Sequence, residues 1–311
     1  MTNIAVIGTG GWGKNHVRVL SELGVLTAVC DIDRPRAEAY GKKFGIKPYS
    51  NADEMLGAEK LDGVIIATPA TTHFAVASKA LRSGVNCFVE KPMTSSIREG
   101  EELIRIARET GKILTVGFIE RFNPAISELK KITNGGTLGN PILFQYHREN
   151  RRGDNITDVG VVKDASVHDI DTARWLFGEE PKTVYARVGS VMGKNEDFAT
   201  ILLGFGGERT AFITTNWVTP MRIRQLNAVF TKGVITVDFI TQEMQIHEEA
   251  ETRVPKHVFM EPLLLELKEF IAAIEEKRQP LVTGSDGLSV IRIAEAVLAS
   301  SKSGSPIYLP P

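Results

Sequence analysis

The stretch IAVIGTGGWG, residues 4–13, joins four apolar residues to glycines with the spacing G-x-G-x-x-G. Apolar side chains then recur at helical spacing through residues 14–23, and Gly24 ends that pattern. A strand, a glycine-rich turn and a helix in this order bring backbone N–H groups close to a bound pyrophosphate. We therefore expect a dinucleotide to bind at Gly8, Thr9, Gly10, Gly11, Trp12 and Gly13.

A second apolar strand, residues 26–30, ends at Asp31, about twenty residues beyond the glycines. A carboxylate at this position accepts hydrogen bonds from the free ribose hydroxyls of NAD and repels the additional phosphate of NADP. Arg34 and Arg36 follow closely, and either side chain could turn toward a phosphate. We expect NAD as the cofactor, with NADP as the less favoured alternative.

Strand and helix patterns alternate as far as residue 118. Helical patterns cover residues 36–44 and 52–56, begin again at His73, and return after Ser95 or Ser96, either of which can cap a helix. Apolar strands cover residues 63–67, 85–89 and 113–118, as in a parallel sheet that is buried on both faces. Residues 1–118 are therefore predicted to form a doubly wound, nucleotide-binding α/β domain.

The tripeptide Glu90-Lys91-Pro92 directly follows the strand 85–89. A residue before proline favours extended backbone, so we expect Lys91 at the carboxyl end of the strand and not inside a helix. Ligands of open α/β sheets bind at this end of the strands, which makes Lys91 a candidate site residue.

Strand patterns dominate residues 119–311, which are predicted to form a second, α+β domain. After a helical pattern at 124–131, strands are expected at 142–147, 183–191, 198–205, 210–217, 226–230, 234–237 and 244–247. Short glycine-containing connections between several of them favour an antiparallel sheet. Helical patterns at 263–276 and 288–301 close the chain, and the last helix is a candidate to pack back on the first domain.

Between the first two of these strands lies a segment rich in polar side chains. If residues 164–175 are helical, Asp164 and His168 share one face, and the carboxylate can orient the imidazole and keep it basic. The alternative is a histidine that only satisfies hydrogen bonds at a domain junction. One histidine among scattered carboxylates is not a typical metal site, so no metal is expected.

The amino-acid composition limits the classes of protein to which this chain can belong. With 42% hydrophobic and 24% charged residues, the 311-residue chain can bury a full core, and its net charge of -1 gives no field that attracts nucleic acid. Cys30 and Cys87 lie in apolar strands, which is typical of reduced core cysteines. No apolar run is long enough to span a membrane. We expect a cytoplasmic protein that binds neither membrane nor nucleic acid.

Together these motifs resemble the glucose–fructose oxidoreductase, inositol dehydrogenase and MocA (Gfo/Idh/MocA) family of sugar oxidoreductases, over essentially the whole chain. The resemblance rests on the glycine motif, on Ala67-Thr68-Pro69 with His73, on Glu90-Lys91-Pro92 and on the spacing of Asp164 and His168. The family pattern often has Gly-Gly before the second motif and Gly between its Asp and His, where this chain has Val159-Gly160-Val161 and Ala165-Ser166. That departure weakens the transfer of details of substrate contact.

The resemblance implies a Rossmann-like first domain and an open, mostly antiparallel sheet that supplies the substrate wall and contacts between subunits. It implies NAD-dependent hydride transfer to or from a sugar-type secondary alcohol, with His168 as the base, Lys91 on the reacting oxygen and Asp164 on a neighbouring hydroxyl. It also implies further cofactor contacts at Thr68, Pro69, His73, Glu90, Lys91 and Arg121. A homodimer or homotetramer is expected.

The run of residues 117–124, GFIERFNP, is similar to members of the family that oxidise UDP-N-acetylglucosamine at C3. Arginines suit a diphosphate, and a tryptophan can cover a sugar or uracil ring. The expected substrate contacts are therefore Lys91, Asp164, His168, Trp217 and the arginines Arg148, Arg151, Arg152, Arg222 and Arg224. These arginines could equally be solvated loop residues or interface contacts.

The alternatives for function are a dehydrogenase of a free sugar or polyol such as myo-inositol, an enzyme that uses hydride transfer only transiently for hydrolysis or elimination, and an NAD-binding sensor without turnover.

Overall fold

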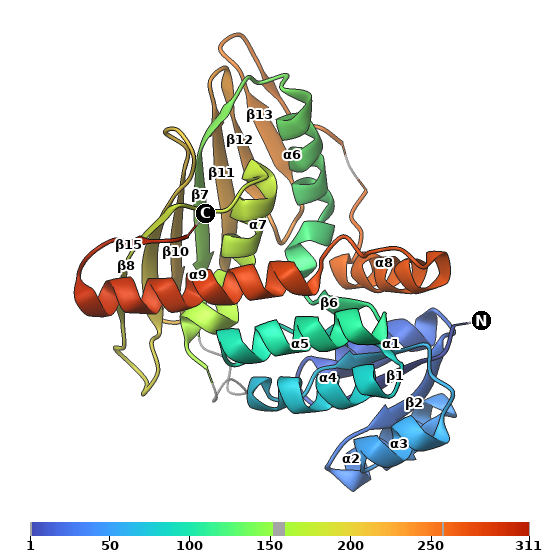
Figure 1. Ribbon diagram of the computed structural model, residues 1–311. Coiled ribbons are helices and arrows are strands. Elements are labelled where there is room, and N and C mark those ends of the chain that lie inside the picture. Colours follow the sequence, from blue (N-terminus) through green and yellow to red (C-terminus); the bar gives the residue numbers. More distant parts are fainter. Residues whose placement is uncertain (1, 152–158, 257, 311) are drawn as a thin grey trace. The chain divides into compact units, whose positions relative to one another are not determined.

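The computed structural model describes residues 2–151, 159–256 and 258–310, and its chain folds into two compact units (Figure 1). The first unit contains Met1–Phe118 and Leu263–Leu288, and the second contains Ile119–Pro262 and Ser289–Pro311. A segment from near the C-terminus therefore completes the unit that the N-terminal residues begin.

The first unit is built on a six-stranded parallel sheet with the strand order β3-β2-β1-β4-β5-β6. This doubly wound order brings the carboxyl ends of β1, β4 and β5 next to one another. The strands are β1 (Ile4–Ile7), β2 (Leu26–Cys30), β3 (Lys47–Tyr49), β4 (Gly63–Ile66), β5 (Asn86–Val89) and β6 (Leu114–Val116). The predicted α/β class of this domain is confirmed.

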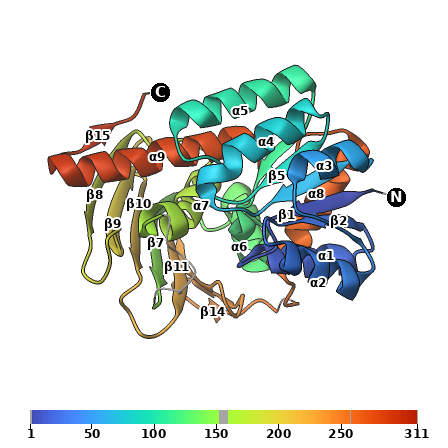
Figure 2. The ribbon, with the colours of Figure 1, turned by 90° about the horizontal axis from the view of Figure 1, so that it is seen from below.

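Helices connect these strands and lie on both faces of the sheet, as Figure 2 shows for α1 and α4. The helices are α1 (Gly13–Glu22), α2 (Arg34–Phe44), α3 (Ala52–Ala58), α4 (His73–Arg82) and α5 (Ile97–Thr110), with a 3-10 turn, η1 (Ala70–Thr72), before α4. Ser96, not Ser95, caps α5 by accepting a hydrogen bond from the Glu99 N–H. The helix α2 begins two residues earlier than its apolar pattern indicates, because Asp33 caps it and a proline occupies its first turn.

Helix α8 (Pro262–Glu276) supplies part of the core of the first unit. Its Phe270 ring meets the Phe88 ring of β5 edge-on, with 5.8 Å between centroids. Gly63 makes room for this helix, because a Cβ there would lie 2.9–3.0 Å from side-chain atoms of Ile4, Phe270 and Ile274. The next helix, α9 (Gly284–Ser303), begins in the first unit and continues in the second.

The second unit contains a nine-stranded sheet with the order β14-β13-β12-β11-β7-β10-β9-β8-β15. All neighbouring strands are antiparallel except β7 and β10, which pair in parallel. The strands are β7 (Pro141–Glu149), β8 (Thr183–Gly189), β9 (Phe198–Gly204), β10 (Thr210–Asn216), β11 (Ile223–Phe230), β12 (Gly233–Asp238), β13 (Met244–His247), β14 (Thr252–Arg253) and β15 (Ile307–Tyr308). The predicted α+β class with a mostly antiparallel sheet is confirmed.

Three helices pack on one face of this sheet, namely α6 (Pro124–Gly135), α7 (Val167–Phe177) and the second part of α9. Phe144 of β7 stacks on Phe177 of α7 with 4.1 Å between ring centroids. Ser300 of α9 accepts a hydrogen bond from the Ala186 N–H of β8 at 3.0 Å, which ties that helix to the sheet. Alternate residues on the opposite face, including Tyr185 and Leu202, are exposed.

Candidate active site

The glycine-rich turn joins β1 to α1 and is tightly packed on one side. Gly8 has a φ of +88°, and a Cβ there would lie 2.6 Å from the Ala67 carbonyl oxygen. A Cβ at Gly13 would lie 1.9 Å from the Gly8 carbonyl oxygen, whereas a Cβ at Gly11 would meet nothing within 4 Å. The turn therefore leaves its outer side open at Gly11, where a pyrophosphate needs access to backbone N–H groups.

Asp31 directly follows β2 and holds the glycine-rich turn in place through hydrogen bonds with Thr9. Its Oδ2 accepts hydrogen bonds from the Thr9 N–H at 2.8 Å and the Thr9 hydroxyl at 2.9 Å, and its Oδ1 accepts one from the Asp33 N–H. Burial raises the pKa of Asp31, but these donors and the nearby Arg36 guanidinium outweigh it, so the pKa lies below its ordinary value. An ionised carboxylate at this place fits the ribose of NAD.

The arginines near Asp31 are engaged with carboxylates. Arg36 lies 3.3 Å from Asp31 and 2.9 Å from Asp33, and Arg34 pairs with Glu38 on the same helix. In the structure, both guanidinium groups that could otherwise bind the additional phosphate of NADP are thus paired with carboxylates. Together with the open turn at Gly11, the residues fit NAD.

His73 is held by backbone carbonyl groups. Its imidazole is 1% exposed, with Nε2 2.8 Å from the Thr68 oxygen and Nδ1 2.9 Å from the Pro92 oxygen. The expectation that this ring contacts the cofactor does not fit its geometry, because both nitrogens face carbonyl oxygens of the protein. His73 instead links the Thr68-Pro69 segment, which follows β4, to the segment after β5.

Glu90 and Lys91 directly follow β5, as expected, and the Lys91–Pro92 peptide is cis. Glu90 is 8% exposed; its Oε1 lies 2.7 Å from Nε2 of His16, and its Oε2 accepts the Lys91 N–H at 3.2 Å. Glu90 is therefore turned toward protein groups, which does not fit the expected contact with the cofactor. Lys91 itself is half-buried.

Asp164 and His168 belong to the second unit, and both are half-buried. They do not lie on one regular α-helix as expected. Val162–Ser166 forms a π-helical turn that contains Asp164, and α7 begins only at Val167. A π-helical turn has a wider spacing than an α-helix, and such turns are frequent at functional sites.

Arg148 lies in a buried ion-pair network. Its side chain donates to Asp169 at 2.7–2.9 Å and to Glu120 at 3.0 Å, and the residue is 4% exposed. Burial lowers the pKa of this guanidinium, but the two carboxylates raise it above its ordinary value. The expectation that Arg148 binds a substrate diphosphate does not fit, because the guanidinium is already engaged by two carboxylates.

Arg121 and Trp217 are also buried, at 3% exposure each. Arg121, in the 3-10 turn η2 (Ile119–Phe122), pairs with Asp171 of α7 through two contacts of 2.6 and 2.7 Å. This buried pair does not fit the expected role of Arg121 in cofactor binding. Trp217 is likewise too buried for its ring to play the expected role of covering a sugar or uracil ring.

The remaining arginines of the predicted group differ in their surroundings. Arg151 and Arg222 are exposed, and Arg152 lies outside the described residues. Arg224 on β11 is half-buried, with Nη2 2.7 Å from the Asn150 Oδ1 and Nη1 3.2 Å from the Ile223 carbonyl oxygen. Burial, together with the charge of Arg148, lowers the pKa of Arg224 to about 10. Both groups that accept its hydrogen bonds are neutral.

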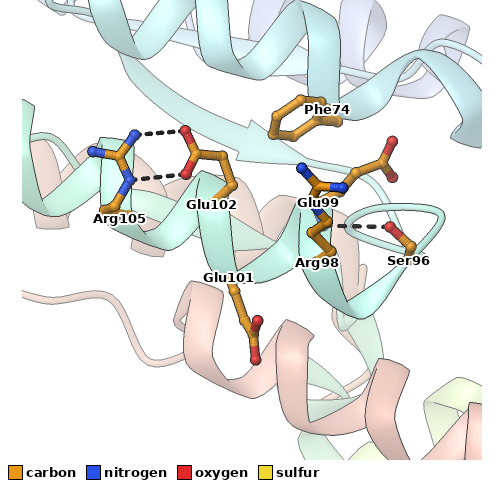
Figure 3. A pocket seen from close by; sticks show the side chains of 7 residues that line it. All are labelled: Phe74, Ser96, Arg98, Glu99, Glu101, Glu102 and Arg105. Atoms are coloured by element: carbon orange, nitrogen blue, oxygen red, sulfur yellow. Dashed lines mark hydrogen bonds and ion pairs between the residues drawn. The ribbon is translucent and has the colours of Figure 1, made fainter.

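A pocket on the first unit contains none of the predicted site residues (Figure 3). It lies between α4 and α5, and Arg105 and Glu102 in its wall pair with each other at 2.6 Å. Its lining is Phe74, Ser96, Arg98, Glu99, Glu101, Glu102 and Arg105. Among the residues that the structure describes, no group of three His, Cys, Asp or Glu side chains could hold a metal ion, and no helix is long and apolar enough to cross a membrane.

Several polar residues that contact predicted site residues were not singled out by the sequence motifs. His16 on α1 contacts Glu90, and Glu120 and Asp169 engage Arg148. His16 carries a detectable signal, because it is polar at a position beside Val17 and Leu20 on the buried face of a helix. Glu120 and Asp169 carry no such signal, since their partner is distant in sequence.

Comparison with known protein families matches both parts of the chain. Residues 2–118 match the domain described as "Oxidoreductase family, NAD-binding Rossmann fold" of the Gfo/Idh/MocA group. Residues 126–236 match the "GFO/IDH/MocA C-terminal domain". The two matches together cover more than half of the chain.

Individual relatives are similar over nearly their whole length. UDP-N-acetylglucosamine 3-dehydrogenase of Acidithiobacillus ferrooxidans is 27% identical, with 93% of this chain and 94% of the relative aligned. A solved structure of that enzyme superimposes with a TM-score of 0.90 over 97% of this chain and 98% of the other. The scyllo-inositol 2-dehydrogenase (NAD(+)) of Bacillus subtilis is 28% identical, with 98% of this chain and 95% of the relative aligned.

Proposed function

Because this chain belongs to the Gfo/Idh/MocA family of NAD-dependent oxidoreductases acting on CH–OH groups, we propose that its substrate is a nucleotide-linked amino sugar, with UDP-N-acetylglucosamine oxidised at C3 as the first choice. The similarity to UDP-N-acetylglucosamine 3-dehydrogenase extends along the whole chain and supports this choice. A free sugar or polyol is the second candidate, supported by the inositol dehydrogenase of similar identity.

The single observation that carries the nucleotide sugar is the state of Arg224. Its hydrogen-bond acceptors are neutral oxygens, and the carboxylates of Asp169 and Glu120 do not outweigh the effects of burial and of Arg148, which lower its pKa. An additional anion would therefore stabilise this guanidinium. Arg151, exposed two residues beyond the end of β7, adds a second positive charge near the strand next to β11. A diphosphate supplies negative charge that can pair with these two arginines, whereas a free polyol carries no charge with which they could form an ion pair.

The proposed chemistry assigns a role to each of three side chains. NAD, when bound, supplies the hydride acceptor for oxidation of the carbinol carbon. His168 would take the proton of the reacting hydroxyl, and Lys91 would donate a hydrogen bond to the same oxygen as negative charge develops. Asp164 would hold a neighbouring hydroxyl and orient His168. In the reverse direction the same groups would protonate a ketone.

The substrate is tested by NADH formation, followed by absorbance, with UDP-N-acetylglucosamine, UDP-glucose, myo-inositol and scyllo-inositol. Arg224→Gln and Arg151→Gln should raise KM for the UDP-sugar by about tenfold or more, since each removes a charge-assisted hydrogen bond. Arg253→Gln, which alters an exposed pair on β14, serves as the control.

Turnover of the free cyclitols without turnover of the UDP-sugars would reject the nucleotide sugar in favour of the second candidate. Cleaved substrate with unchanged net NAD would indicate transient hydride transfer, and binding of NAD without any turnover would indicate a sensor.

We further propose that the protein forms a homodimer or homotetramer through the second unit. The face of its sheet opposite to α6 and α7 exposes Tyr185 at 39% and Leu202 at 43% on adjacent strands. Exposed apolar side chains on adjacent strands favour cover by another copy, and closed twofold arrangements are common. Light scattering at micromolar concentration tests this, and a monomer there would contradict it. Tyr185→Asp combined with Leu202→Asp should shift the protein toward monomer.

A further inference from the structure

Two buried histidines of the first unit contact the residues on either side of Lys91. His16 on α1 is fully buried and lies 2.7 Å from the carboxylate of Glu90, the residue before Lys91. His73, the first residue of α4, lies 2.9 Å from the carbonyl oxygen of Pro92, the residue after Lys91. Each histidine comes from a helix that follows a different strand of the parallel sheet.

We propose that His16 and His73 are positioning residues that hold Lys91 in place from its two sides. The inference rests on the proposed function, in which Lys91 contacts the reacting oxygen. Neither histidine would touch the substrate. Each would act through the backbone that carries Lys91.

The contact of His16 reaches the Lys91 backbone through Glu90. The imidazole donates from Nε2 to the Glu90 Oε1, while Oε2 of the same carboxylate accepts the Lys91 N–H at 3.2 Å. The Phe88 ring on β5 packs against the same imidazole in a T-shaped arrangement, with 5.4 Å between ring centroids, and limits its rotation. The orientation of the Glu90 carboxylate, and with it the Lys91 N–H, is therefore set from α1.

Gly117 limits the position of Glu90 from another side. A Cβ at Gly117 would lie 2.9 Å from Oε2 and 3.1 Å from Oε1 of Glu90. The carboxylate thus occupies the space that the missing side chain leaves beside β6. This arrangement permits only a small displacement of Glu90 between His16 and the Gly117 backbone.

His73 fixes the backbone on the other side of Lys91. Its second nitrogen lies 2.8 Å from the Thr68 carbonyl oxygen, so the ring bridges the segments that follow β4 and β5. An imidazole with hydrogen on both nitrogens donates to both carbonyls, and with one hydrogen it donates to one. With hydrogen on both nitrogens, the ring links Pro92 to the neighbouring strand end that packs against the glycine-rich turn.

The first test is amide hydrogen exchange of the full-length protein without substrate. His16→Leu and His73→Leu should each speed exchange in the peptide of residues 86–95 by about tenfold or more, while exchange in β1 and β4 stays at the wild-type rate. His16→Gln, which keeps a donor near the position of Nε2, should restore slow exchange. The control is His247→Leu, which alters a histidine on β13 of the second unit.

Steady-state kinetics with NAD and the best substrate provide the second test. His16→Leu and His73→Leu should lower kcat by about 10- to 100-fold with KM for NAD changed by less than about threefold, because displacement of a reacting group slows the chemical step. Gly117→Ala should have the same effect without any change to a histidine. The His16→Gln variant should recover most of kcat.

The outcomes distinguish the positioning role of the two histidines from the proposed enzymatic function. Wild-type exchange in residues 86–95 of both leucine variants would overturn the positioning role, as would a loss of kcat that His16→Gln does not restore. If the wild-type protein oxidises no sugar at all, the proposed function fails, and the exchange measurement still decides whether the histidines hold Lys91.

Discussion

Arg121 and Asp171 form a buried ion pair in which two guanidinium nitrogens contact both carboxylate oxygens, at 2.6 and 2.7 Å. Asp171 is also 3.5 Å from Arg174, so one carboxylate serves two buried cations. The pair connects η2 to α7, the helix that carries His168. A structural element that positions a proposed base is thus anchored by charge inside the core of the second unit.

Removal of this carboxylate should destabilise the protein. Asp171→Ala leaves buried positive charge without its ionic partner, and we expect a loss of about 3–5 kcal/mol in the free energy of unfolding. Urea denaturation followed by circular dichroism measures it. Arg121→Met combined with Asp171→Leu should cost less than Asp171→Ala alone, because no buried charge of the pair remains. Equal losses in the single and double variants would contradict this account.

The glycines of the β1–α1 turn should differ in their tolerance of alanine. Gly13→Ala places a Cβ 1.9 Å from the Gly8 carbonyl oxygen, so the turn must open, and both thermal stability and affinity for NAD should fall. Gly11→Ala is the matched control, because its Cβ meets nothing within 4 Å. We expect Gly11→Ala to keep the wild-type Tm in the absence of NAD. A Gly13→Ala protein with wild-type Tm would refute the packing argument.

The two cysteines should be unreactive in the folded protein. Burial, with smaller contributions from Asp31 and Glu54, raises the pKa of Cys30 to about 11, and burial raises the pKa of Cys87 as well. The thiolate is the reactive form, so neither residue should react appreciably with a thiol reagent at pH 8. Both should react after unfolding in urea. Rapid labelling of the folded protein would show that one of these thiols is accessible and ionised.

The motifs near the chain's strand ends were predictable from local sequence. The glycine turn, Asp31 and Lys91 each depend on a short pattern and on the rule that ligands bind at the carboxyl ends of parallel strands. The α/β class of the first unit and the α+β class of the second unit followed from the same local periodicity. These features need no knowledge of contacts between distant residues.

The partners of the charged residues were not predictable in this way. Arg148 suggested diphosphate binding and Arg121 suggested cofactor binding, but Asp169 and Asp171 lie 21 and 50 residues away from them and come close only in the folded unit. Nor does an apolar helical pattern reveal that α8 completes a unit formed by residues at the other end of the chain. The π-helical turn before α7 was also missed, because the spacing of Asp164 and His168 equally suits an α-helix.

The carboxylate of Asp31 should make stability depend on pH in the acid range. Its folded-state pKa is lowered below the ordinary value of 3.8, because donated hydrogen bonds and Arg36 outweigh the effect of burial. The stabilisation is therefore fully present above pH 3.8 and is lost as the pH falls through the folded-state pKa. The free energy of unfolding of the wild type minus that of Asp31→Asn should shrink below about pH 4. Glu38→Gln, on the exposed face of α2, is the control, and a difference that stays constant down to pH 2 would rule out this role.

Lys91 and His168 should both contribute strongly to turnover, and His168 should contribute little to cofactor binding. Lys91→Ala removes a donor to the oxygen on which negative charge develops, and His168→Ala removes the proposed base, so each should lower kcat by about 100-fold or more. The dissociation constant for NAD, measured by calorimetry, should change little in His168→Ala, since the proposed NAD site lies in the first unit. Lys163→Ala is a neighbouring control, because this lysine pairs with Glu295 on the second part of α9. Near-normal turnover of His168→Ala across the pH range would place the base at another residue.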